Sequence, residues 1–322
     1  MKVSDVQSGG IDTLVAVVIG IAGSGVLFSS SLVVPLIGFV SAFLAPAPLG
    51  YARIRGGSIA AGFAALITTL LMAILFSPPV GAWYAVQCGL IGMVIPELLL
   101  KGVQQFRTVL WSTALAILVS AAMITAFSLG SGTDPRSFVS KEIAEGVSQA
   151  VKLYEQQSGL SAQDMEQLRQ GMQKVGQLMG RIYPALATIN LGLICTVSML
   201  IFSRTAARFG LQVARTSFRE FRTPPLLVWL LIAAGFAMLF PSPLVTTPAL
   251  NLLVVLGVLY FLQGLAVVLT QVERMKFGGT LKVLLAIILL TQPYLAVIVA
   301  IIGIFDYWGE FRTPRTTQGE NL

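Results

Sequence analysis

Few side chains in this sequence could do chemistry, because charged residues make up only 11% of it and histidine is absent. Glu97 follows Pro96 near the end of an apolar run, and Lys101 stands four residues later. The two can pair on one face of a helix at the membrane surface, which explains Glu97 more simply than a proton relay does. The absence of histidine excludes Ser-His-Asp triads and imidazole metal sites.

A second group of ionisable residues follows the last apolar run. Asp306 and Glu310 stand one helical turn apart, and two carboxylates at this spacing could bind a cation or share a proton. Arg312 and the ring of Trp308 lie close by in the sequence and favour an anchor at the membrane interface instead. No cofactor site or metal site is therefore predicted, and we expect no enzymatic activity.

The pentapeptide EFRTP occurs twice, at 220–224 and at 310–314. The match does not extend beyond these five residues, so an internal duplication is not indicated. In the first copy, Thr223 and Pro224 suit the cap and the first turn of a helix. We interpret the two copies as markers of the same membrane surface, each placed where an apolar run meets it. The candidate interface motif consists of Asp306, Trp308, Arg312, Glu220 and Arg222.

Uncharged polar residues are also placed within the apolar runs. Each could stabilise a helix interface by about 1 kcal/mol through a hydrogen bond to a neighbouring helix. Alternatively, they could converge on one cavity for a solute. The candidate polar cavity consists of Gln87, Glu97, Asn190, Asn251 and Gln263.

The elements that must position these residues are membrane helices. Apolar residues make up 56% of the chain and charged residues only 11%, whereas about a quarter of the residues in a soluble domain are charged. A span needs about 20 mostly apolar residues. The sequence therefore predicts an all-α, polytopic transmembrane bundle with spans at 12–28, 31–48, 58–77, 80–100, 107–128, 182–203, 225–241 and 248–271.

The last apolar stretch, 279–305, has two possible topologies. It could enter the membrane and return as a re-entrant hairpin that turns near Pro293, which gives eight spans plus the hairpin. It could instead be a straight ninth span with the tail outside. The hairpin would place both EFRTP copies at the same surface.

Charge predicts the orientation, because positive loops stay in the cytoplasm. Basic residues occupy the connections after the second, fourth, sixth and eighth spans, so we expect a cytoplasmic N-terminus in the inner membrane of a bacterium. One of these connections suits contact with anionic lipid headgroups through Arg204, Arg208, Arg215 and Arg219. Nucleic-acid binding is not expected of so short a tethered segment.

Residues 129–181 interrupt the spans with a polar insert. Asp134-Pro135 begins one amphipathic helix, Ser158-Gly159 ends it, and a second helix begins at Ser161 and continues past Pro184 into the next span. The predicted regions are membrane helices at 1–128, an extracytoplasmic helical hairpin at 129–181, membrane helices at 182–308 and a polar tail at 309–322. A membrane protein partner could bind the hairpin over 135–180, or the small-residue face Ala60–Ala65.

The end of the chain resembles the YybS-like bacterial membrane proteins, a family of unknown function. The resemblance is carried by EFRTP leading into Trp229, by NLLVVLGVLYFLQG at 251–264, and by GIFDYW at 303–308 with Phe311-Arg312. It implies a distant similarity in fold to substrate-binding subunits of energy-coupling-factor transporters and to MreD. We therefore expect a transporter-like subunit that handles a small solute or lipid, or alternatively a non-catalytic scaffold of the cell envelope.

Overall fold

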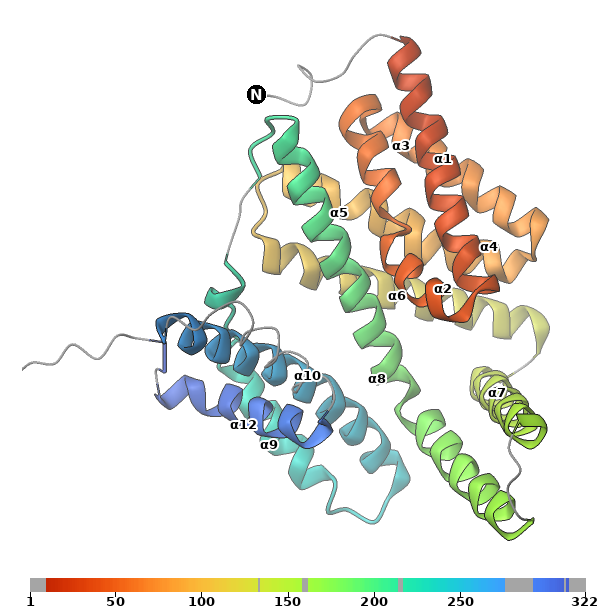
Figure 1. Cartoon of the computed structure of the whole chain (residues 1–322), viewed down its shortest axis with the longest axis vertical. Helices are drawn as coiled ribbons and strands as arrows, with labels where there is room; N and C mark the ends of the chain where they lie inside the picture. Colours follow the sequence, from red (N-terminus) through yellow and green to blue (C-terminus); the bar gives the residue numbers. More distant parts are fainter. Residues whose placement is uncertain are drawn as a thin grey trace, which may run out of the picture. The chain divides into compact units, whose positions relative to one another are not determined.

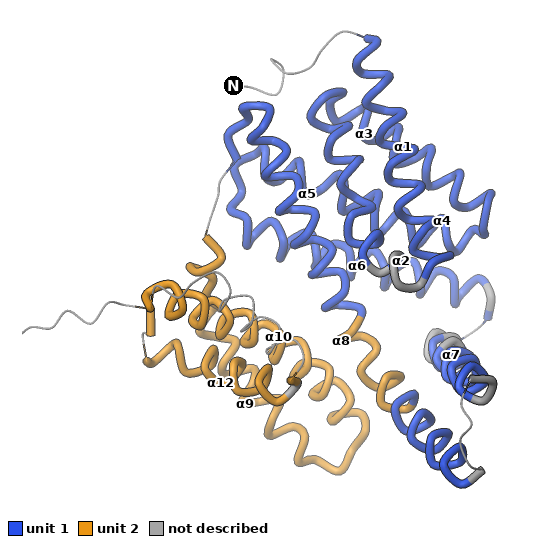
Figure 2. The backbone as a smooth tube through the Cα atoms, viewed as in Figure 1, with its two compact units in different colours: residues 1–176, 187–216 blue, residues 177–186, 217–322 orange. Residues whose placement is uncertain are grey.

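The computed structural model describes residues 10–132, 134–157, 162–213, 217–275, 292–309 and 311–312, and every regular element in them is helical (Figure 1). The all-α prediction is confirmed. The chain forms two compact units (Figure 2). Unit 1 comprises 1–176 and 187–216, and unit 2 comprises 177–186 and 217–322.

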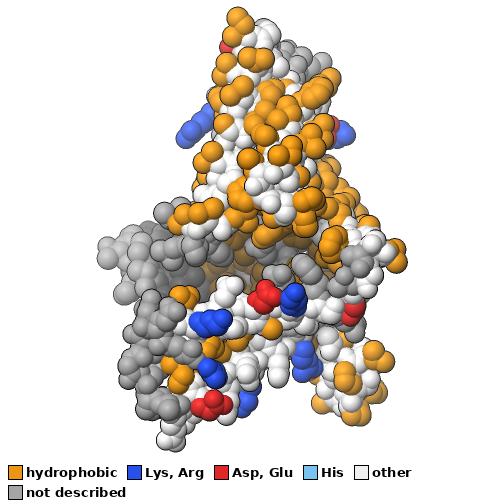
Figure 3. All heavy atoms as spheres, turned by 90° about the vertical axis from the view of Figure 1, so that its right-hand side faces the viewer, with side chains coloured by type: hydrophobic (Ala, Val, Ile, Leu, Met, Phe, Trp, Pro, Cys, Tyr) orange, Lys and Arg blue, Asp and Glu red, His pale blue; other side chains and the backbone are white. Residues whose placement is uncertain are grey.

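Several helices of the described chain are long and apolar enough to cross a bilayer, which makes this a multi-pass membrane protein. The exposed surface agrees, since hydrophobic side chains cover most of the unit 1 face in the upper half of Figure 3. The candidate spans are Gly10–Val33, Val40–Leu75, Pro78–Leu100, Gln105–Gly130, Gln163–Arg208 and Pro243–Arg274.

Helix α1 (Gly10–Val33) is longer than the predicted span 12–28, because the serines that follow Phe28 remain helical. The hydroxyls of Ser30 and Ser31 donate to the carbonyls of Leu27 and Phe28 at 2.8 and 2.6 Å. These bonds hold the serine hydroxyls against the preceding helical turn, so the hydroxyls do not pull the backbone out of the helical conformation. The helix ends before Pro35, which disfavours helical geometry at Val34.

The second crossing was predicted over 31–48, and this boundary is wrong. It consists of α2 (Pro35–Leu44) and the first arm of α3 (Ala47–Leu75), with a break after Leu44. Gly57 then interrupts α3 with φ 82° and ψ −179°, a conformation open essentially to glycine alone. The chain reverses there, since Gly20 of α1 lies against residues of both arms, Ala52 and Ala64.

The remaining helices of unit 1 form its core. Helices α4 (Pro78–Tyr84) and α5 (Ile91–Leu100) are joined by a π-helical turn, η2 (Ala85–Leu90), and α6 (Gln105–Ser131) follows. Side chains of α5, α6 and α8 pack together, among them the fully buried Ile91, Leu99, Ala116 and Ile194.

The predicted helices of the polar insert are confirmed. Helix α7 spans Pro135–Gln157, and α8 spans Ala162–Arg208 as one element of 47 residues with Pro184 inside it. The two pack where Gly176 of α8 lies close to Ile143 and Val147 of α7.

The small-residue face is used inside unit 1. Ala60, Ala61, Ala64 and Ala65 are all buried, whereas Phe63 on the opposite side of the same helix is exposed. This face therefore packs against helices of its own unit and is not free for a partner.

Unit 2 is built around α10 (Pro243–Arg274). The shorter helices α9 (Leu226–Ala237) and α12 (Pro293–Gly309) pack against the same part of it, and the short helix η3 (Phe218–Glu220) precedes α9. Val228, Leu256 and Tyr260 form the centre of this packing, with Ala300 and Ile304 contributed by α12.

Helix α12 runs parallel to α10, with the C-terminal ends of both helices together (Figure 1). Gly264 and Gly303 permit this contact, since a Cβ on Gly303 would lie 2.0 Å from the carbonyl oxygen of Tyr260. A straight ninth span over 279–305 would run antiparallel to α10, so the direction of α12 agrees with the re-entrant hairpin. Residues 276–291, which would form the entering arm, lie outside the described residues.

Candidate functional site

The C-terminal end of α12 brings Phe311 and Arg312, the described residues of the second EFRTP copy, close to the first copy in unit 2. Asp306 is fully buried there, and its Oδ2 accepts hydrogen bonds from Nη2 of Arg312 at 2.8 Å and from Nε2 of Gln263 at 3.3 Å. A buried carboxylate requires such partners, because an isolated charge is costly to remove from water. Asp306 is therefore held between the second copy and α10.

Gln263 connects this carboxylate to the first copy. Its Oε1 accepts hydrogen bonds from the backbone N and from Oγ1 of Thr223, at 2.9 and 2.5 Å. Thr223 precedes α9, where backbone N–H groups have no partner within a helix. The amide of Gln263 thus satisfies a donor of the first copy with one end and the carboxylate of Asp306 with the other.

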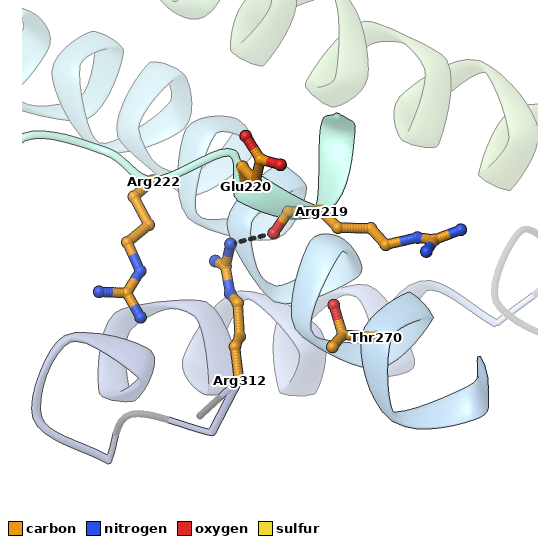
Figure 4. A pocket seen from close by; sticks show the side chains of 5 residues that line it. All are labelled: Arg219, Glu220, Arg222, Thr270 and Arg312. Atoms are coloured by element: carbon orange, nitrogen blue, oxygen red, sulfur yellow. Dashed lines mark hydrogen bonds between the residues drawn. The ribbon is translucent and has the colours of Figure 1, made fainter. Parts of the chain in front are cut away.

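Arg312 fixes the second copy against the first. Its Nη1 donates to the carbonyl of Arg219 at 2.5 Å, as Figure 4 shows, and its Nη2 also contacts the carbonyl of Gln263 at 3.5 Å. The carbonyl of Phe311 accepts bonds from Nε2 of Gln271 at 2.6 Å and from Nη1 of Arg274 at 3.3 Å. Phe311 of the second copy is therefore bound to the end of α10, whereas Thr223 of the first copy is bound to Gln263 further back on the same helix.

An open hollow of about 390 Å³ lies at this junction, lined by Arg219, Glu220, Arg222, Thr270 and Arg312 (Figure 4). Arg312 is neutralised by Asp306, and Arg219 forms an ion pair with Glu273. The side chains of Arg219 and Arg222 are each 51% exposed, but Arg222 has the looser ion pair, since its Nε lies 3.9 Å from Oδ2 of Asp306, the atom that Arg312 already contacts at 2.8 Å. The guanidinium of Arg222 is the arginine group of the hollow that is most available to a ligand.

We call Arg219, Glu220, Arg222, Thr223, Gln263, Asp306 and Arg312 the double-EFRTP cluster. The cluster contains three arginines and two carboxylates, and Arg219 also forms an ion pair with Glu273 outside the cluster, so Arg222 is the arginine with the longest ion-pair distance. A guanidinium in such a setting can bind a phosphate or carboxylate through paired hydrogen bonds. Among the described residues, no group of three His, Cys, Asp or Glu side chains could hold a metal ion.

The structure confirms the predicted pair of Glu97 and Lys101 and adds a partner to it. Nζ of Lys101 lies 3.3 Å from Oε1 of Glu97, and Nη2 of Arg53 lies 3.0 Å from Oε2. Arg53 was missed because it is 44 residues away in the sequence.

Asn251 has a separate role within unit 2. Its Oδ1 accepts from the backbone N of Ala185, and its Nδ2 donates to the carbonyl of Arg181, both at 2.8 Å. These bonds flank Pro184, the proline inside α8, which cannot donate a backbone hydrogen bond of its own. Asn251 thus supports the backbone of α8, and Gln263 belongs to a different network.

The other polar residues of the predicted cavity lie in unit 1. Gln87 is buried in η2, and its Oε1 has no hydrogen-bond partner in the structure. Asn190 is exposed on α8. Because Asn251 and Gln263 already use their polar groups in separate networks, the prediction of one shared cavity gains no support.

The residues predicted to contact headgroups are distributed between the units. Arg204 and Arg208 are exposed at the end of α8 in unit 1, whereas Arg219 belongs to the double-EFRTP cluster. Arg215 lies outside the described residues. Trp308 is 60% exposed, two residues from the buried Asp306, as a ring at the membrane interface would be.

Three comparisons bear on identity. The comparison with curated proteins and that with solved structures returned no match. The fold similarity to transporter subunits and to MreD therefore stays a prediction. A family model described as a predicted membrane protein, DUF2232, matches residues 24–307, and the chain belongs to this family.

Proposed function

We propose that this protein is a non-enzymatic lipid-handling protein of the bacterial cytoplasmic membrane. In this proposal its N-terminus is cytoplasmic, and the double-EFRTP cluster binds the phosphate of a phospholipid headgroup at the inner surface. The basic connections between spans support the orientation.

The half-exposed guanidinium of Arg222 carries the proposal. It lines the hollow beside Arg312, whose own position is fixed by Asp306 and by the carbonyl of Arg219. Figure 4 shows the two side chains approaching from the two copies, Arg222 from the first and Arg312 from the second.

Two observations favour a lipid over a soluble substrate. The exposed ring of Trp308 stands two residues from Asp306, which indicates that the cluster lies at headgroup depth. In addition, Asn251 and Gln263 hydrogen-bond in separate networks, so they do not form a midplane solute site together.

The test compares lipids retained by the purified full-length chain. Native mass spectrometry in bilayer nanodiscs would count bound phospholipids for wild type, Arg222→Gln and Arg107→Gln. Arg107 is an exposed arginine of unit 1 outside the cluster, so its substitution removes the same charge elsewhere. We expect Arg222→Gln alone to reduce retention. Equal retention by all three proteins would reject the proposal.

A scaffold role is the second candidate, and one observation favours it. Leu153 and Tyr154 of α7 are 57% and 53% exposed, although α7 packs against α8 elsewhere. Apolar side chains on a polar hairpin can serve as an anchor for a partner protein. Crosslinking in cells would compare wild type with a Leu153→Glu, Tyr154→Glu variant. An unchanged set of crosslinked proteins would count against this role.

A further inference from the structure

The apolar helices that flank α10 are short for a membrane. Helix α9 has 12 residues and α12 has 17, which correspond to about 18 and 25 Å at 1.5 Å per residue. The hydrocarbon core of a bilayer is about 30 Å thick. Both helices pack on the same part of α10, so the shortness affects one region of unit 2.

Side-chain exposure shows the length of the surface that α12 offers to lipid. Tyr294, Val297, Ile301, Phe305 and Trp308 are each at least 45% exposed, and their spacing places them along one side of the helix. Tyr294 and Trp308 mark the two ends of this stripe. Aromatic rings of this kind favour the headgroup region, and here they are about 21 Å apart along the helix.

The backbone at the start of α12 also requires a polar environment. Gln292 is not helical, and Pro293 has no N–H to donate. Irregular backbone is not tolerated against lipid tails, so it must be covered by protein or reached by water. The side chain of Gln292 is partly exposed, and its amide group prefers water to hydrocarbon. The polar boundary would then dip to Gln292 on this side of unit 2.

A bilayer adapts to a short apolar surface by becoming locally thinner. Thinning shortens the path that a headgroup must travel through hydrocarbon. The thinner region of the bilayer would lie beside α12. Arg222 and Arg312 lie next to Asp306 at the inner end of this helix, and the polar Gln292 precedes its other end.

We infer that unit 2 lets phospholipids cross between the two leaflets beside α12, as a passive lipid scramblase. The inference rests on the proposed function, because the headgroup enters or leaves at Arg222. The movement follows the lipid gradient, requires no nucleotide and forms no covalent bond. Its ligand class is the glycerophospholipid with a phosphate diester, and the acyl chains stay in the bilayer during the crossing.

The experiment uses the full-length chain in vesicles of phosphatidylethanolamine and phosphatidylglycerol with a trace of fluorescent phosphatidylglycerol. Dithionite, which does not cross the membrane, destroys the fluorophore in the outer leaflet only. We expect vesicles with protein to lose nearly all fluorescence, and protein-free vesicles to lose only the outer share. Arg222→Gln should slow the loss of fluorescence from lipids that start in the inner leaflet, and Arg107→Gln should not.

Two controls protect the result. Size-exclusion profiles and melting temperatures equal to wild type would show that Arg222→Gln is folded. A trapped fluorescent sugar would report leakage, and its loss at the same rate would overturn the inference. Loss of only the outer share in vesicles with protein would also overturn it, while the proposed function would survive if lipid retention still depended on Arg222. If inner-leaflet fluorescence stays intact and lipid retention also does not depend on Arg222, both proposals are rejected.

Discussion

Arg312 donates a hydrogen bond to the fully buried carboxylate of Asp306 at 2.8 Å, and only 9% of its own side chain is exposed. The bond joins the second EFRTP copy to the end of α12. Because both partners are removed from water, each depends on the other for charge compensation.

Asp306→Asn should destabilise unit 2 strongly, because it leaves the guanidinium of Arg312 buried without its carboxylate. The expected loss in the free energy of unfolding is about 3 kcal/mol. Denaturation in detergent micelles would measure it. Asp12→Asn is the matched control, since Asp12 is half exposed and 3.6 Å from Arg55, and it should cost less than about 1 kcal/mol. Equal effects would contradict the buried pair.

The contact of α10 with α12 should fail when a methyl group is added to it. A Cβ on Gly264 would lie 1.8 Å from the carbonyl oxygen of Val299, so Gly264→Ala forces the helices apart. We expect a loss of about 3 kcal/mol or more. Gly257→Ala on the same helix has no atom within 4 Å of its new Cβ and should be neutral or stabilising. Similar melting temperatures for the two variants would show that the contact is not as close as described.

Gly57→Ala should weaken unit 1 through its backbone alone. The φ of 82° with ψ of −179° strains any residue that has a Cβ, at a cost of about 1–3 kcal/mol. Gly62→Ala lies in the second arm of the same helix, where the nearest atom would be 3.7 Å from the new Cβ, and should be tolerated. The unfolding midpoints of both variants in detergent would measure these two effects. An unchanged midpoint for Gly57→Ala would argue against the reversal of the chain direction at Gly57.

The two EFRTP copies should be accessible from the same side of the membrane. In a variant with Cys88 and Cys195 replaced by alanine, cysteines at Glu220 and at Thr317 should react with an impermeant maleimide only after the membrane is opened. A cysteine at Ser242, at the other end of α9, should react in intact cells. Reaction of the Thr317 cysteine in intact cells would place the second copy outside and contradict its contact with the first.

The sequence predicted those features that depend on neighbours in the chain. Glu97 and Lys101 pair because four residues make one helical turn, and Pro135 begins a helix because its ring suits a first turn. The repeated pentapeptide indicated one boundary, since the same residue types suit the same interface.

Features that depend on distant contacts were missed. Gln263 and Asp306 are 43 residues apart in the sequence. No local pattern indicates that the close contact of α10 with α12 at Gly264 and Gly303 brings them together. The first span was predicted to end at residue 28, because the bonds of Ser30 and Ser31 to the preceding turn, which continue α1 to Val33, are not visible in composition. Asn251 was assigned to a cavity, although its real partners are backbone groups beside Pro184.

The link between Gln263 and both copies has a consequence for biogenesis. Thr223 and Gln263 leave the ribosome well before Asp306 and Arg312, yet all four form one network. During that interval the amide of Gln263 lacks one of its final partners inside a nascent membrane protein. Unit 2 therefore completes its polar network only after translation of the second copy.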